Sequence, residues 1–161
     1  MASAPLPRPS KGPDLTFTRI LNAPRELVFK AWTDPKQMAQ WWGPRVFTNP
    51  VCEMDVRPGG ALRIVMRAPD GVEYPMTGVF REVVEPERLS FTTVAEDQSG
   101  TPVLEGLVNV IFVEDGGKTK LTVHSGAVGL VPQAAAMLDG MQEGWSQSLE
   151  RLAELLTKGA R

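Results

Sequence analysis

The fold is decided by the C-terminal stretch of residues 131–158, VPQAAAMLDGMQEGWSQSLERLAELLTK. Apolar side chains recur in this stretch at spacings of three and four residues, which is typical of a helix with one buried face. The apolar stripe consists of Leu138, Met141, Trp145, Leu149, Leu152 and Leu156. Gly140 and Gly144 interrupt the stripe, and a glycine costs a helix up to about 1 kcal/mol relative to alanine. We therefore predict one long amphipathic helix that kinks, or closely approaches another element, at these glycines.

Upstream of this helix, apolar residues alternate with polar ones, as they do in half-buried strands. Such runs lie at residues 46–56, 60–67, 72–84, 88–95, 103–113 and 118–125. The segments Pro58-Gly59-Gly60, Asp70-Gly71 and Asp115-Gly116-Gly117 are short enough to be hairpin turns. Consecutive hairpins predict an antiparallel meander. The last turn runs into Gly117-Lys118-Thr119, which resembles the end of a phosphate-binding loop, but a strand and not a helix follows it.

The N-terminal part adds one further strand and two short helices. Residues 15–21 alternate in the manner of a strand, and Pro24 then suits the first turn of a helix. Asp34-Pro35 ends that helix and opens a second one, which reaches to about residue 40. Residues 1–13 contain four prolines and predict a disordered leader. We expect residues 14–158 to form a single domain and residues 159–161 to form a tail.

Composition excludes several classes of function. The 161 residues contain 17 Lys and Arg against 19 Asp and Glu, a net charge of −2, which argues against a nucleic acid partner. No run approaches the roughly 20 apolar residues of a membrane span, and no secretory signal precedes the domain, so we predict a cytoplasmic protein. No HExxH, CxxC or GxGxxG pattern occurs, so the sequence predicts neither a metal site nor a cofactor.

A long helix and a curved sheet must bury each other's apolar faces. The sequence therefore predicts an α+β fold in which a curved seven-stranded antiparallel sheet wraps around the long C-terminal helix. The two short helices follow the first strand. A pocket remains where the long helix does not fill the concave face of the sheet.

This order of elements is the helix-grip arrangement of the Bet v 1/START-like (SRPBCC) superfamily. The residues resemble its branch of bacterial proteins similar to activator of Hsp90 ATPase homologue 1, the AHSA1-like family. The resemblance rests on VFKAWTDP at 28–35, WWGP at 41–44, DVRPGG at 55–60, GVF at 78–80, ERL at 87–89 and GW at 144–145. It implies a hydrophobic cavity between the long helix and the sheet, and it implies no shared set of catalytic residues.

We expect the cavity to bind a small hydrophobic molecule, lipid-like or polyketide-like. Period-two alternation on the strands and the helical stripe place one set of apolar side chains toward the concave face. Ordinary core packing explains each of these residues equally well. The candidate cavity residues from this set are Met66, Met76, Phe80, Phe91, Val110, Phe112, Met141 and Trp145, and Trp42 is added from the aromatic turn near one end of the cavity.

Two other functions stay open. A cyclase or hydratase would need a polar cavity residue, for which Asp55, Glu73, Tyr74 and His124 are the candidates. A chaperone-interaction module would need an exposed apolar patch, for which the turn containing Trp41-Trp42 is the candidate. A homodimer through an edge strand of the sheet is a further possibility.

The remaining reactive side chains favour structural roles. Glu53 and Asp55 share one face of a strand, and we expect Asp55 to pair with turn amides or with Arg57 or Arg63. His124 alternates with Leu121 and Val123, so it faces outward if they face the core. Cys52 has no visible triad partner and is interpreted as a buried or half-buried residue and not as a nucleophile.

Overall fold

The structure is a computed structural model that describes residues 10–132 and 134–159. These residues form a seven-stranded antiparallel sheet in the spatial order β1-β7-β6-β5-β4-β3-β2. The strands are β1 (Ser10–Leu21), β2 (Thr48–Met54), β3 (Ala61–Arg67), β4 (Glu73–Val84), β5 (Arg88–Glu96), β6 (Pro102–Asp115) and β7 (Lys118–Gly129). Strands β2 to β7 pair consecutively as the predicted meander, and β1 returns to pair with β7, which leaves β1 and β2 at the edges.

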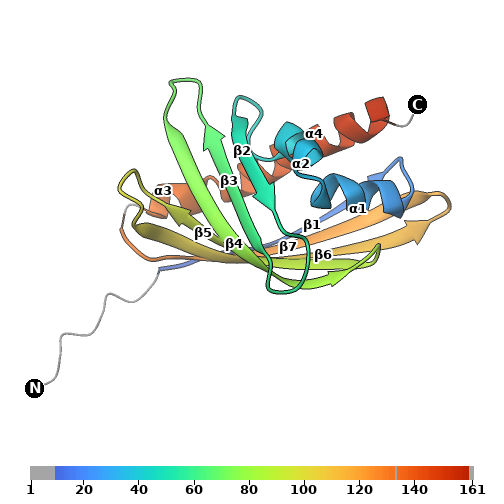
Figure 1. Ribbon diagram of the computed structural model, residues 1–161, viewed down its shortest axis with the longest axis horizontal. Coiled ribbons are helices and arrows are strands. Elements are labelled where there is room, and N and C mark those ends of the chain that lie inside the picture. The colour runs from blue at the N-terminus through green and yellow to red at the C-terminus, as the bar shows by residue number, and fades with distance from the viewer. Residues whose placement is uncertain (1–9, 133, 160–161) are drawn as a thin grey trace, which may run out of the picture.

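The helices gather on one side of this sheet, as Figure 1 shows for α1, α2 and α4. They are α1 (Arg25–Thr33), α2 (Pro35–Trp41), α3 (Ala134–Asp139) and α4 (Met141–Gly159). The Asp34 side chain accepts a hydrogen bond from the backbone N–H of Lys36 at 3.0 Å, so it caps α2 just after α1 ends. The predicted helix-grip fold is confirmed. No helix in residues 10–132 and 134–159 combines the length and the apolarity that crossing a bilayer requires.

Two boundaries differ from the sequence predictions. The first strand begins at Ser10, which pairs with Gly129, so residues 10–13 belong to the sheet and not to the leader. The rest of the predicted leader, residues 1–9, lies outside the described residues, as does the end of the tail at residues 160–161. The C-terminal helix is divided at Gly140 into α3 and α4, which places the predicted kink at this glycine.

The core fills most of the space between helices and sheet. Its largest fully buried side chains include Trp32 and Trp41 from the short helices and Phe80, Phe91 and Phe112 from the strands. Trp32 lies 4.6 Å from Trp41 between ring centroids, and its ring stacks at 6.2 Å on that of Trp145 from α4. These aromatic contacts join α1, α2 and α4 into one layer.

Candidate ligand-binding pocket

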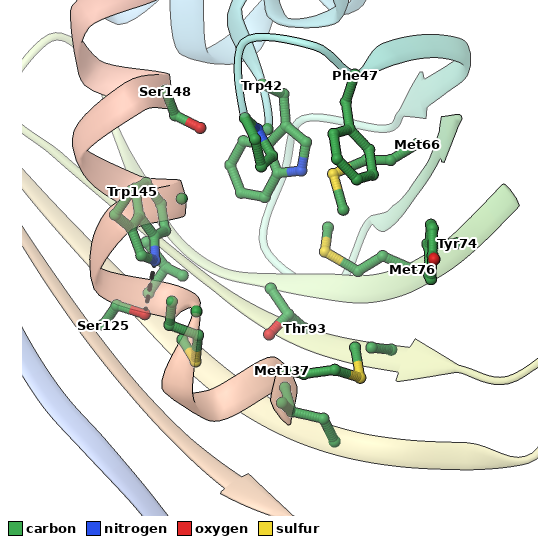
Figure 2. A pocket seen from close by; sticks show the side chains of 18 of the residues that line it. Trp42, Phe47, Met66, Tyr74, Met76, Thr93, Ser125, Met137, Trp145 and Ser148 are labelled. Atoms are coloured by element: carbon green, nitrogen blue, oxygen red, sulfur yellow. Dashed lines mark hydrogen bonds between the residues drawn. The ribbon is translucent and has the colours of Figure 1, made fainter. Parts of the chain in front are cut away.

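A half-open pocket of about 330 Å³ remains beyond the end of this aromatic core. Its walls come from α3, the first half of α4, strands β3 to β7 and the segment of residues 42–47 that follows α2. Figure 2 shows that side chains from the helices and from the sheet face one another across it. The pocket therefore lies where the predicted cavity was expected, between the C-terminal helix and the concave face of the sheet.

Two tryptophans form the inner end of the pocket. Trp42 and Trp145 meet edge to face with ring centroids 5.4 Å apart, and both are buried. The indole Nε1 of Trp145 donates a hydrogen bond to the Ser125 hydroxyl of β7 at 3.1 Å (Figure 2). This bond fixes the ring against the sheet, so the inner end is a rigid aromatic surface.

Methionines line much of the remaining wall. Met66 and Met76 come from β3 and β4, and Met137 comes from α3 (Figure 2). Met141 of α4 also lines the pocket. Methionine is flexible and polarisable, and its sulfur makes favourable contacts with aromatic rings. A wall of this kind can adjust to the shape of an apolar ligand.

The segment of residues 42–47 passes over the pocket and is held to α4 by Arg151. The guanidinium donates hydrogen bonds to the backbone carbonyls of Gln40, Trp42, Gly43 and Pro44 at 2.9–3.1 Å. Gly43 has a φ of +89°, and a Cβ there would lie 2.8 Å from the Met66 sulfur. Only glycine combines this backbone conformation with so close an approach to the pocket wall.

The predicted cavity residues divide into two groups. Trp42, Met66, Met76, Met141 and Trp145 line the pocket. The other predicted residues are at most 1% exposed and pack in the core away from it, so the expectation that they line the cavity is corrected; they are Phe80, Phe91, Val110 and Phe112.

Several lining residues were not predicted from the sequence. Met137 lies four residues before Met141, so the helical stripe contained a signal for it. Phe47 follows the tryptophan turn and packs 5.9 Å from the Tyr74 ring, which no sequence pattern connects. Ser125 and Ser148 are buried polar residues, and only the tertiary contacts bring them to the pocket.

The Trp41-Trp42 turn is not an exposed surface. Trp41 is completely buried, its Nε1 donates to the Ala31 carbonyl at 3.0 Å, and Trp42 is 8% exposed. The exposed apolar patch that a chaperone-interaction module would need at this turn is therefore absent, and that expectation is corrected. The rings serve the core and the pocket instead.

The candidate acid–base residues lie away from the pocket, apart from Tyr74 at its wall. Asp55 accepts a hydrogen bond from Arg57 at 2.8 Å, which confirms its structural interpretation, and Glu73 pairs with Arg67 at 2.6 Å. His124 faces away from buried Val123, as predicted, and pairs with Asp14 of β1. Among the described lining residues there is no carboxylate, imidazole, amine, guanidinium or thiol. The described residues also contain no cluster of side chains suited to a metal ion.

Cys52 is half-buried on β2, and burial raises the pKa of its thiol to about 11, with nearby Asp34 and Glu53 adding to the effect. At pH 8, the fraction of Cys52 in the reactive thiolate form should then be about one in a thousand, against roughly a quarter for a free thiol. We expect iodoacetamide to alkylate the folded protein at least about 100-fold more slowly than the unfolded protein at pH 8. The rate should rise about tenfold per pH unit up to pH 10. A folded-state rate equal to the unfolded rate would contradict this, and mass spectrometry measures both.

The architecture and the pocket together define a helix-grip protein with a cavity between its C-terminal helix and its sheet. The family model described as activator of Hsp90 ATPase homolog 1-like protein matches residues 22–157, and the chain belongs to this family. The resemblance seen in the sequence is thereby confirmed. No curated protein matches the sequence.

Solved bacterial structures support the same assignment. A protein from Mycobacterium smegmatis is 30% identical, with a TM-score of 0.73 over 89% of this chain and 90% of that one. The AHSA1 protein from Silicibacter pomeroyi is 27% identical, with a TM-score of 0.76 over 91% of this chain and 99% of that one. A protein from Nitrosomonas europaea is also 27% identical, with a TM-score of 0.75 over 91% and 96%.

Proposed function

We propose that this protein binds a small hydrophobic molecule in the pocket between α3, α4 and the sheet. The observation that carries the proposal is the pocket itself, whose wall consists of tryptophan, phenylalanine, methionine and aliphatic carbon with few polar atoms. Its volume of about 330 Å³ lies at the lower end of the range of small-molecule sites, roughly 300–1,000 Å³. This size favours one compact molecule over a long-chain lipid.

Burial of apolar surface is sufficient to bind such a molecule. Removing roughly 200–300 Å² of apolar ligand surface from water contributes about 5–7 kcal/mol before the costs of association. That supports micromolar or weaker affinity without a charged anchor. The lack of acid–base groups among the described lining residues, Tyr74 excepted, favours binding over a cyclase or hydratase reaction. The cytoplasmic location remains part of the proposal and rests on the sequence.

A pocket-filling variant tests the proposal. Ala95 of β5 lines the pocket, so Ala95→Phe places a ring inside it, whereas Val79→Phe adds the same ring at a 44% exposed position outside it. We expect the neutral fluorescent probe N-phenyl-1-naphthylamine to bind the wild type and Val79→Phe alike. Ala95→Phe should weaken binding at least about tenfold, because the ring removes the volume that the probe needs.

Probe fluorescence gives the affinities, and thermal unfolding shows whether each variant remains folded. Equal affinity for Ala95→Phe and Val79→Phe would mean that the probe binds elsewhere. Lack of binding to the wild type up to the solubility of the probe would overturn the proposed function.

A further inference from the structure

The hydroxyl of Ser148, a buried residue, faces the pocket and has no hydrogen-bond partner among the described residues. Ser148 lies on α4, is 4% exposed and lines the pocket, and its Oγ makes no hydrogen bond with any described residue. Figure 2 shows this oxygen pointing away from α4 toward Trp42. Ser125 differs, because its hydroxyl already accepts the Trp145 N–H. The Ser148 oxygen faces the pocket, so a ligand that fills the pocket must either offer it a hydrogen bond or leave it without a partner, and the second outcome is costly.

The side chains that line the pocket also indicate whether the ligand is charged. No lysine or arginine is among the described residues that line the pocket. Arg151, on the next turn of α4, uses its guanidinium on four backbone carbonyls, and Arg45 pairs with Glu150 and Glu154 outside. A carboxylate or phosphate held beside Ser148, at the inner end of the pocket, would be desolvated without an opposite charge, which is strongly unfavourable.

We propose that the ligand is uncharged and largely apolar, that it carries one hydroxyl or carbonyl oxygen, and that Ser148 hydrogen-bonds to this oxygen. The inference rests on the proposed function and deepens it by naming the ligand class. A serine hydroxyl both donates and accepts, so it serves an alcohol, a phenol or a ketone. The remaining ligand surface contacts the Trp42 and Trp145 rings and the methionine side chains, which suits a compact ring system.

Two matched probes test the role of Ser148. 2-Naphthol is neutral at pH 7 and has one hydroxyl, and naphthalene is the same ring system without it. The variant Ser148→Ala removes the proposed hydrogen bond. Ser90→Ala makes the same change at a buried serine of β5 that does not line the pocket. Titrations followed by the indole N–H signals of the four tryptophans give the affinities and report on the pocket.

We expect Ser148→Ala to weaken 2-naphthol binding about 3- to 10-fold, the size of one neutral hydrogen bond, and to leave naphthalene binding unchanged or tighter. Ser90→Ala should change neither affinity. An equal loss for both probes in Ser148→Ala would overturn the hydrogen bond and assign the residue to packing. The unliganded spectrum of each variant shows whether its fold is retained.

A third probe, 2-naphthoate, tests whether the ligand must be uncharged, because it is anionic at pH 7. We expect it to bind the wild type at least about 30-fold more weakly than 2-naphthol, because its carboxylate would be buried without a cation. Binding as tight as that of 2-naphthol would overturn the neutral ligand class while leaving the proposed function intact. If none of the three probes shifts an indole signal of the wild type, the proposed function fails as well.

Discussion

Trp32→Ala is expected to lower the free energy of unfolding by about 3–5 kcal/mol, the cost of deleting a large core side chain. Trp32 is completely buried on α1 and contacts rings from four other elements, among them Trp41 at 4.6 Å, Phe112 at 6.4 Å and Trp145 at 6.2 Å. Domains of this size have a total stability of about 5–15 kcal/mol, so the loss is a large part of it. Urea unfolding followed by circular dichroism measures the effect.

A pair of conservative variants tests how much the indole N–H groups of this core contribute to stability. The Nε1 atom of Trp32 is buried without a hydrogen-bond partner among the described residues, whereas that of Trp41 donates to the Ala31 carbonyl. Trp32→Phe and Trp41→Phe remove similar volumes, but only the second breaks a buried hydrogen bond. Trp41→Phe should therefore cost about 1–2 kcal/mol more than Trp32→Phe. Equal costs, or a larger cost at Trp32, would contradict this difference.

Arg151→Met should lower the free energy of unfolding by about 2–4 kcal/mol, since it deprives four backbone carbonyls of a charged donor. Burial lowers the pKa of Arg151, but a guanidinium remains protonated at neutral pH even so. All four hydrogen bonds therefore persist at neutral pH. Methionine keeps most of the apolar length of the side chain. Urea unfolding gives the change in stability. N-phenyl-1-naphthylamine should also bind more weakly to Arg151→Met than to the wild type, because residues 42–47 lose their attachment to α4.

Arg45 provides the control for this prediction. It also joins residues 42–47 to α4, through Glu150 at 3.1 Å and Glu154 at 2.5 Å, but its side chain is 44% exposed. Exposed ion pairs contribute little to stability, so Arg45→Met should destabilise the protein much less than Arg151→Met does. If Arg45→Met destabilised the protein as much as Arg151→Met, backbone capping by Arg151 would not be the main attachment of the segment.

The strands were predictable because their cause is local. Alternation and the turn glycines predicted the meander, and Gly116 and Gly117 have the positive φ values that the last hairpin requires. The end of β7 was not predictable in this way. Its last residues, 126–129, lie beyond the predicted run of 118–125 and are mostly glycine and alanine, which are depleted in strands. They belong to β7 because β1 pairs on one side and β6 on the other.

The break in the C-terminal helix also depends partly on the local sequence and partly on tertiary packing. Gly140 and Gly144 were both candidates for a kink, since both interrupt the apolar stripe. The structure breaks at Gly140, while Gly144 continues the helix beside the pocket, where an added Cβ would meet Pro44 at an ordinary 3.9 Å. Which glycine breaks the helix depends on the packing of α3 against the sheet, and no local propensity contains that information.

For the pocket, strand periodicity predicts which side chains face the helices, whereas contacts between distant segments determine which of these side chains remain uncovered. Val108, Val110 and Phe112 alternate along one face of β6, and period two predicts that face for all three. Phe112 is covered by Phe29 of α1, with ring centroids 5.2 Å apart, and Val110 is buried beside it, whereas Val108 lines the pocket. The face follows from the geometry of one strand. The position of the pocket along that strand follows from where α1 ends, and this is a contact between segments about 80 residues apart.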